Sequence, residues 1–240
     1  MTRNSLLLCV LASLIACHSS RDPSGGEGTQ ELRIAPESQT HAEALHQGAK
    51  EREPDLTRLL QTLARDHGAS LHGLEHRLKS VESLARKIQT DVELGKATLP
   101  ANVVIEDALR YTMLIWDDPR GRYDKVTRTV LRELESRGHQ VRLVKNYWPR
   151  GDTYAGLNCV LAFADGFHWE LQFHTPGSLA AVQEGHDLYE ILRLPGTPLT
   201  ERQRLFDRLT TRWNWVLIPK GILEPKSVHA KEVLRAHKRP

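Results

Sequence analysis

Cysteine is scarce in this sequence, and none of the cysteines is placed for a disulfide inside a folded domain. There are three, of which Cys9 and Cys17 lie near the N-terminus and Cys159 lies far along the chain. If a leader is removed before Cys17, Cys159 has no disulfide partner within the chain. Cys159 has apolar neighbours, so we interpret it as a small core residue and not as a nucleophile.

The sequence also lacks the ligand spacing of a zinc site. His67, His72 and His76 include one pair at helical i, i+4 spacing. No third and fourth ligand follow at the spacing of a zinc site, so we interpret these histidines as surface residues.

The chain has little excess charge of either sign. Its 33 basic and 30 acidic side chains give a formal net charge of +3, too small to indicate nucleic-acid or membrane binding by charge alone. With 40% hydrophobic residues, 240 residues can bury one core without a structural metal. We therefore expect one domain, in which any phosphate site comes from local clustering of cations.

A pronounced apolar run occurs at the N-terminus. Arg3 precedes an apolar stretch from Leu6 to Ile15, which is too short to span a bilayer. The stretch ends in Leu-Ile-Ala-Cys, which resembles a lipobox. The pattern predicts a lipoprotein signal peptide over residues 1–16 and a lipid on Cys17 that attaches the chain to a membrane. An ordinary secretory signal or an uncleaved anchor is the alternative.

Composition divides the remaining chain into three parts. Residues 17–54 are rich in Gly, Ser, Glu, Gln and His, which predicts a flexible tether. Residues 55–218 carry the periodic apolar pattern of a folded domain. Residues 219–240 form a basic tail rich in Pro and Lys, which we expect to fray.

Helices are predicted over residues 56–88, 123–137 and 199–215, and strands over 109–115, 140–144, 157–163 and 168–174. In the last strand the residues after His168 alternate between apolar and polar, so one face is core and the other carries polar groups. For Asn158 to share that polar face, the loop before this strand must be odd in length, and we expect a three-residue turn at Asp165–Phe167. The order of elements predicts an α+β fold with a mixed, largely antiparallel sheet flanked by helices.

Short polar motifs occur in a set order along this domain. They are Arg77-Leu78-Lys79-Ser80 with Ser83 and Lys87, Asp107-Ala108-Leu109-Arg110, Lys145-Asn146-Tyr147, Tyr154-Ala155-Gly156-Leu157-Asn158, Glu170-Leu171-Gln172-Phe173-His174-Thr175, and His186 with Tyr189. Together they resemble the RelA/SpoT-like (p)ppGpp synthetases, a family of nucleotide pyrophosphokinases with a nucleotidyltransferase-like fold and with toxin-type members. The resemblance spans about Leu74 to Tyr189. It implies transfer of the β,γ-pyrophosphate of ATP to a nucleotide or tRNA hydroxyl, with Mg²⁺ as cofactor.

The resemblance also implies roles for single residues. ATP phosphates would be bound by Arg77, Lys79, Ser83 and Lys87, which fall on the predicted helix face away from its apolar stripe. Asp107 and Glu170 would hold Mg²⁺, and with Gln172 they form the implied catalytic group. The acceptor would contact Lys145, Tyr154, Asn158 and His174, with Tyr154 stacking on its base. His186 and Tyr189 would support the site from the following helix.

Departures from the family pattern leave the acceptor open. After Asp107 the family commonly has Gly and then Arg, where this chain has Arg110 and Thr112. The acceptor loop lacks its usual arginine, and His174 replaces the arginine that follows the Glu-x-Gln motif. GDP or GTP, an adenosine nucleotide and the 3′ end of tRNA all stay as candidates.

The implied chemistry and the leader point to different compartments. A lipid on Cys17 predicts a bacterial cell envelope protein, in the periplasm or at the outer membrane, where ATP is scarce. We expect a toxin delivered into the cytoplasm of a recipient cell, with an immunity protein as partner. The alternatives are a non-catalytic envelope lipoprotein that binds a nucleotide or a protein through a degenerate synthetase fold, and a cytoplasmic protein without a signal peptide.

Overall fold

The computed structural model describes residues 33–99, 103–149, 154–194, 196–223 and 233–235. The predicted signal peptide and Cys17 lie outside the described residues. The elements are α2 (Pro36–Asp66), β1 (Ser70–His72), η2 (Leu74–His76), α3 (Val81–Glu93), β2 (Arg110–Leu114), α4 (Arg122–Ser136), β3 (Gln140–Asn146), β4 (Leu157–Ala162), β5 (His168–His174), α5 (Pro176–Arg193), α6 (Leu199–Trp213) and β6 (Val233–Arg235).

The strands form one six-stranded sheet in the order β1-β2-β5-β4-β3-β6. The pairs β2–β5 and β3–β6 are parallel, and the pairs β1–β2, β5–β4 and β4–β3 are antiparallel. The predicted α+β class, with a mixed and largely antiparallel sheet flanked by helices, is confirmed.

The β4–β5 hairpin has the predicted pairing of faces. Cys159 pairs with Leu171 and Asn158 pairs with Gln172, so apolar residues oppose apolar ones and polar residues oppose polar ones. The turn itself lies one residue earlier than predicted. The Phe163 amide donates to the Phe167 carbonyl at 2.9 Å, which places the three-residue turn at residues 164–166.

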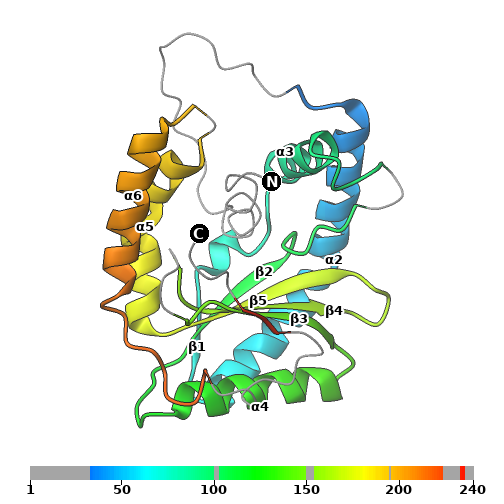
Figure 1. Cartoon of the computed structure of the whole chain (residues 1–240). Helices are drawn as coiled ribbons and strands as arrows, with labels where there is room; N and C mark the ends of the chain where they lie inside the picture. Colours follow the sequence, from blue (N-terminus) through cyan, green and yellow to red (C-terminus); the bar gives the residue numbers. More distant parts are fainter. Residues whose placement is uncertain (1–32, 100–102, 150–153, 195, 224–232, 236–240) are drawn as a thin grey trace.

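The two faces of the sheet have different environments. On one face, β5 contributes Trp169, Leu171 and Phe173, each fully buried in the core. Tyr123 of α4 donates from its hydroxyl to the Phe173 carbonyl at 2.7 Å, so α4 covers this apolar face. The other face, which carries Glu170, is the polar face. Figure 1 shows α4 below the sheet, with α5 and α6 rising on one side of the opposite face and α3 on the other.

The tether predicted over residues 17–54 is wrong for residues 36–54, which form the larger, N-terminal part of the helix α2. Its buried stripe begins with Ala42 and Ala49 and continues through Leu56 and Leu60. Alanine has a small apolar surface, so this half of the stripe is weak in the sequence pattern. Ser38 anchors it to α3 through a 2.9 Å bond to Gln89.

The predicted helix over residues 56–88 is also wrong, because the chain breaks between α2 and α3. Gly68 and Gly73 both have positive φ, at 60° and 64°, a conformation that favours glycine and ends helical structure. Between them lies β1, and η2 follows. Arg77 and Lys79 therefore precede α3 and do not lie on a helix face.

The C-terminal part of the domain extends further than the predicted boundary at residue 218. Ile222 is fully buried, and its carbonyl accepts a hydrogen bond from Asn146 Nδ2 at 2.9 Å. In the predicted basic tail, β6 pairs with β3. Within the described part of the chain, no helix combines the length and apolarity that crossing a membrane requires.

Candidate active site on the polar face of the sheet

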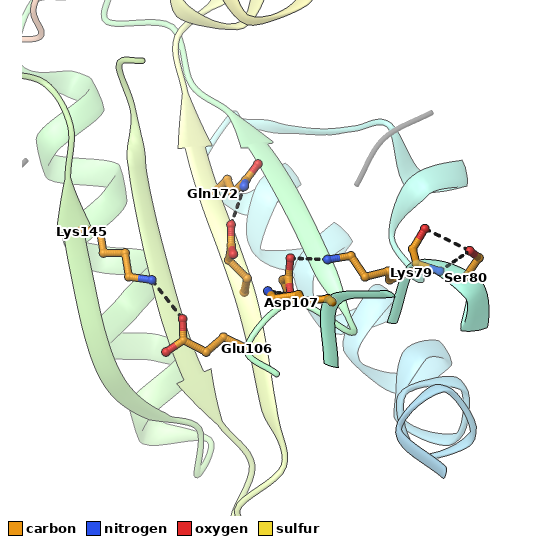
Figure 2. Close-up of polar contacts among 9 residues, drawn as sticks. Lys79, Ser80, Glu106, Asp107, Lys145 and Gln172 are labelled. Atoms are coloured by element: carbon orange, nitrogen blue, oxygen red, sulfur yellow. Dashed lines mark hydrogen bonds and ion pairs between the residues drawn. The ribbon is translucent and has the colours of Figure 1, made fainter. Parts of the chain in front are cut away.

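Asp107 lies between two lysines at the edge of the polar face. Its Oδ2 is 2.5 Å from Lys79 Nζ and its Oδ1 is 2.6 Å from Lys87 Nζ. The side chains of Asp107 and Lys79 are 1% and 5% exposed. Figure 2 shows Lys79 directed at Asp107 from the segment that precedes α3.

Backbone pairing explains how Lys79 reaches Asp107. Leu78 and Leu109 form an isolated antiparallel bridge. The Lys79 amide donates to the Ala108 carbonyl at 3.1 Å, and the Arg110 amide donates to the Arg77 carbonyl at 2.8 Å. Residues 77–79 thus run beside the start of β2, which fixes the lysine next to the aspartate.

The charges around Asp107 set the ionisation of the group. Burial acts to raise the pKa of Asp107, but Lys79 and Lys87 outweigh burial and hold this pKa below its ordinary value. Burial lowers the pKa of Lys79 to about 8, although Asp107 acts to raise it. Two ammonium groups against one carboxylate leave this edge with an excess of positive charge.

Glu170 lies in the interior of β5 on the same face. It is buried, and Gln172 Nε2 donates a hydrogen bond to its Oε1. Burial raises the pKa of Glu170, and the negative charge of Asp107 raises it further. Arg110 pairs with Glu170 in the parallel β2–β5 register and acts in the opposite direction on that pKa.

The N-terminus of α3 lies next to Lys79. Ser80 is its N-cap, and the Ser80 Oγ accepts a hydrogen bond from the Ser83 amide at 3.3 Å. Ser83 and Lys87 are four residues apart on α3 and so share one face of it. Backbone amides at a helix start and two lysines can together bind phosphate oxygens.

Arg77 does not join this group in the structure. Its Nε donates to the Glu53 carboxylate of α2, and its Nη1 donates to the Leu74 carbonyl. The hydrogen bond from Arg77 is the largest cause that lowers the pKa of Glu53. Glu53 also accepts a hydrogen bond from Thr57 at 2.6 Å. The structure therefore places Arg77 in a network that joins α2 to the segment before α3.

Lys145 lies on β3, at the other side of the polar face. Its Nζ is 3.0 Å from Glu106 Oε2. Glu106 immediately precedes Asp107, and Figure 2 shows the Glu106 and Lys145 side chains extending toward each other over the sheet. The Lys145 and Glu106 side chains are 15% and 33% exposed.

Tyr154, Asn158 and His174 form one buried hydrogen-bonded group. The Tyr154 hydroxyl lies 2.8 Å from both Asn158 Oδ1 and His174 Nε2, and it donates to the former. His174 Nδ1 lies 2.9 Å from the Ser178 Oγ at the start of α5. Burial lowers the pKa of His174 to about 3, so the imidazole is neutral at pH 7.

The Tyr154 ring is packed and is only 4% exposed. Its neighbours are the rings of Tyr147, His174 and Trp213, with centroids at 5.2, 5.3 and 5.8 Å. Gly156 permits this packing, because an added Cβ would lie 3.0 Å from the His174 ring. In this conformation the ring is not open as a stacking surface for a base.

His186 and Tyr189 both lie on α5. The His186 Nδ1 is 3.9 Å from Glu190 Oε1 on the same helix. Tyr189 is partly buried and packs against the hydrophobic core. Their predicted supporting role stays a prediction.

A cavity of about 1320 Å³ is lined by residues of α5, α6 and the loop before α4. Its lining includes Asp117, Arg204, Asp207 and Trp215. None of its lining residues is one of the predicted site residues, so we base the site on side-chain geometry and not on this cavity.

The structure thus brings Lys79, Lys87, Asp107, Glu170 and Gln172 to one face, with Lys145 and Asn158 on neighbouring strands. Sequence reasoning missed the site positions of Glu106 and Arg110. The pairing of Arg110 with Glu170 depends on the β2–β5 contact, which no local sequence pattern indicates.

The sequence and the structure were both compared with those of known proteins. The sequence matches no family model, and no curated protein matches it. Among solved structures, the type VI effector Tas1, in complex with its immunity protein, is similar with 20% identity, a TM-score of 0.50, and coverage of 73% of this chain and 95% of that chain.

Two further similar structures have lower TM-scores. A GTP pyrophosphokinase family protein from Streptococcus pneumoniae is 13% identical, with a TM-score of 0.48 and coverage of 75% of this chain and 89% of that chain. Small alarmone synthetase 2 from Bacillus subtilis is 14% identical, with a TM-score of 0.49 and coverage of 70% and 88%. The likeness to Tas1 shows that this chain shares the fold of that effector.

Proposed function

We propose that this chain is a pyrophosphokinase that transfers the β,γ-pyrophosphate of ATP to a hydroxyl of a nucleotide or a tRNA. The observation that carries the proposal is the Asp107 carboxylate, held by Lys79 and Lys87 on the same sheet face as Glu170. The order of motifs along the chain and the fold shared with Tas1 support it.

The donor end of the site would be the edge formed by Lys79, Lys87 and the start of α3. A triphosphate carries several negative charges, and the excess positive charge of the two lysines attracts it. Ser83 adds a hydroxyl on the same helix face as Lys87. Arg77 would contribute only if its bond to Glu53 is exchanged for a phosphate.

The carboxylates Asp107 and Glu170 fit a magnesium ion. Each Asp107 oxygen accepts one ion-pair hydrogen bond, which leaves further lone pairs for a metal. No group of three or more acidic, histidine or cysteine ligands occurs among the described residues. Mg²⁺ commonly uses one or two carboxylates together with substrate phosphates, which agrees with this pair. When bound, the ion neutralises charge on the transferred group.

In the proposed reaction, the acceptor hydroxyl oxygen attacks the β-phosphorus of ATP. A new oxygen–phosphorus bond forms, the bond from the β-phosphorus to the bridging α,β oxygen breaks, and AMP leaves. Glu170 accepts the hydroxyl proton, and burial, which raises the pKa of Glu170, makes its carboxylate a stronger base for that role. Gln172 holds the Glu170 carboxylate in position.

The acceptor would lie over Lys145, Asn158 and the Tyr154–His174 pair. Stacking of a base on Tyr154 requires movement of Tyr147 or Trp213, because both rings pack against it. The same burial favours a second candidate function, in which the domain binds a nucleotide or a protein without turnover. Binding of an ATP analogue without any transfer would support this second candidate.

We also propose that the chain is a lipid-anchored envelope protein and a toxin delivered into recipient cells, with an immunity protein as partner. The lipobox-like motif at Cys17 and the likeness to an effector crystallised with its immunity protein support these proposals. Expression of the chain without residues 1–16 in a bacterial cytoplasm tests the toxin proposal. Growth arrest that is abolished by Glu170→Gln is expected, and harmless expression of an active enzyme would contradict the toxin proposal.

The experiment that tests the reaction is incubation with γ-labelled ATP and a panel of GMP, AMP, GDP, GTP, ADP and tRNA. Label should move from ATP onto an acceptor, with release of unlabelled AMP. Transfer to water or to no acceptor would contradict the proposed function.

A further inference from the structure

Residues from four adjacent strands lie in one row across the polar face. The registers pair Thr112 with Gln172, Gln172 with Asn158, and Asn158 with Lys145. Thr112 Oγ1 donates to Gln172 Oε1 at 3.3 Å, which links the first two side chains of the row. Lys145 is therefore next to Asn158 at the end of the row opposite β2.

The charge of Lys145 is already balanced at this end. Glu106 Oε2 lies 3.0 Å from its ammonium group, and the lysine side chain is only 15% exposed. Glu106 directly precedes Asp107, which the two lysines fix in the site. The backbone position of Glu106 is therefore fixed as well. A phosphate that binds Lys145 must share it with Glu106 or displace this carboxylate.

Asn158 has a donor that lacks a partner. The residue is 1% exposed, its Oδ1 accepts from Tyr154, and its Nδ2 has no hydrogen-bond partner among the residues that the structure describes. A buried amide nitrogen without a partner is unfavourable, so such a group marks a place where a ligand oxygen or nitrogen completes the bonding. An amide donor can bind a neutral or a weakly charged acceptor atom.

We propose that Glu106 is a specificity-determining residue that selects an acceptor ribonucleoside with a single phosphate group at its 5′ side. This inference rests on the proposed pyrophosphokinase function. Two kinds of acceptor meet this requirement. One is a free nucleoside 5′-monophosphate, and the other is the 3′-terminal nucleoside of an RNA, whose 5′ side is a phosphodiester. Nucleoside 5′-diphosphates and triphosphates are disfavoured as acceptors.

Electrostatics provides the reason for the selection. One phosphate group can share the Lys145 ammonium with Glu106, and Asn158 Nδ2 can donate to a sugar or base atom. A diphosphate places additional negative charge beside Glu106, where Lys145 is the cation that the two anionic groups share. Like charges at short range in a partly buried site repel strongly.

The test compares pairs of nucleotide acceptors that differ only in phosphate number, together with a short RNA. The full chain is incubated with γ-labelled ATP and with GMP or GDP, AMP or ADP, or a short RNA with a free 3′ end, and kcat/KM is measured for each. The wild type should favour monophosphate or RNA over diphosphate by at least about tenfold. The monophosphate and RNA arms distinguish the two sources.

Glu106→Gln removes the charge and keeps the shape, so it should reduce this preference about tenfold or more by improving the use of diphosphates. The matched control is Glu135→Gln, an exposed position on α4 across the sheet, which should leave the preference unchanged. Because Glu106 is one-third exposed, its replacement by Gln should not unfold the chain; Glu106→Ser is a second variant that removes the same charge.

Calorimetric titration with GMP and GDP separates this inference from the proposed function. Transfer to an acceptor without a monophosphate preference, or a preference that Glu106→Gln does not change, overturns the inference alone. A binding preference that depends on Glu106 without any transfer supports the selectivity and overturns the pyrophosphokinase function. If neither transfer nor a binding preference is observed, both the inference and the proposed pyrophosphokinase function are overturned.

Discussion

Lys79 Nζ lies 2.5 Å from Asp107 Oδ2, and both side chains are almost entirely buried. The stability of the folded chain at this position depends on the presence of both charged side chains. Removal of one partner leaves the other charged group without compensation in a poorly hydrated place. The pair is therefore both a proposed part of the active site and a determinant of stability.

Asp107→Asn should lower the free energy of unfolding by about 3–5 kcal/mol, because Lys79 then remains buried without its counter-ion. Urea denaturation monitored by circular dichroism measures the change. The double variant Lys79→Met/Asp107→Leu should lose less stability than the sum of Lys79→Met and Asp107→Leu. Additive losses would contradict a direct interaction between the two side chains.

The stability of the domain should fall in mild acid because of His174. Its pKa in the folded protein is about 3, against an ordinary value of 6.5. Below pH 6.5 the unfolded chain therefore binds a proton that the folded chain does not, so the contribution of this group falls as the pH decreases. At pH 5 the loss should be about 2 kcal/mol relative to pH 7.

Denaturation of the wild type and of His174→Gln at pH 7 and pH 5 isolates this contribution from that of other titrating groups. The variant has no imidazole to protonate, so its loss of stability between the two pH values should be smaller. Equal losses in the two proteins would show that His174 is not buried in a neutral form.

Tyr154→Phe should destabilise the domain by about 1–3 kcal/mol, because it leaves Asn158 Oδ1 and His174 Nε2 without their hydrogen bonds to the hydroxyl. The packing of the ring is retained in this variant. Thermal denaturation gives the change in stability. A variant as stable as the wild type would contradict the buried hydrogen-bonded arrangement.

A fatty-acid probe should label the wild-type chain in growing bacteria if Cys17 is lipidated, and Cys17→Ser should abolish the label. Cys9→Ser is the matched control, because Cys9 lies within the predicted signal peptide. Its label should equal that of the wild type. Labelling that survives Cys17→Ser would disprove the lipoprotein prediction.

The hairpin and its two faces could be predicted from sequence because their signal is local. Trp169 to His174 alternate between apolar and polar, and a strand turns alternate side chains to opposite faces. This pattern placed Glu170, Gln172 and Asn158 on one face, and the register confirms it.

The segment before α3 could not be predicted in the same way. Leu78 and Val81 fit a helical spacing, but in the structure Leu78 pairs with Leu109 and only Val81 belongs to α3. Contacts between distant segments overrode the local periodicity. The Glu106–Lys145 pair has a similar origin, because it depends on the order of β5, β4 and β3 in the sheet.

The most direct test of the central claim is the rate of pyrophosphate transfer from γ-labelled ATP by the wild type and by Glu170→Gln. Glutamine keeps the shape of the side chain but cannot hold a metal as a carboxylate or accept the hydroxyl proton. The rate should fall by about a hundredfold or more, while Glu135→Gln on α4 stays at the wild-type rate. A wild type that labels no acceptor, or a Glu170→Gln variant that transfers as fast as the wild type, would contradict the account.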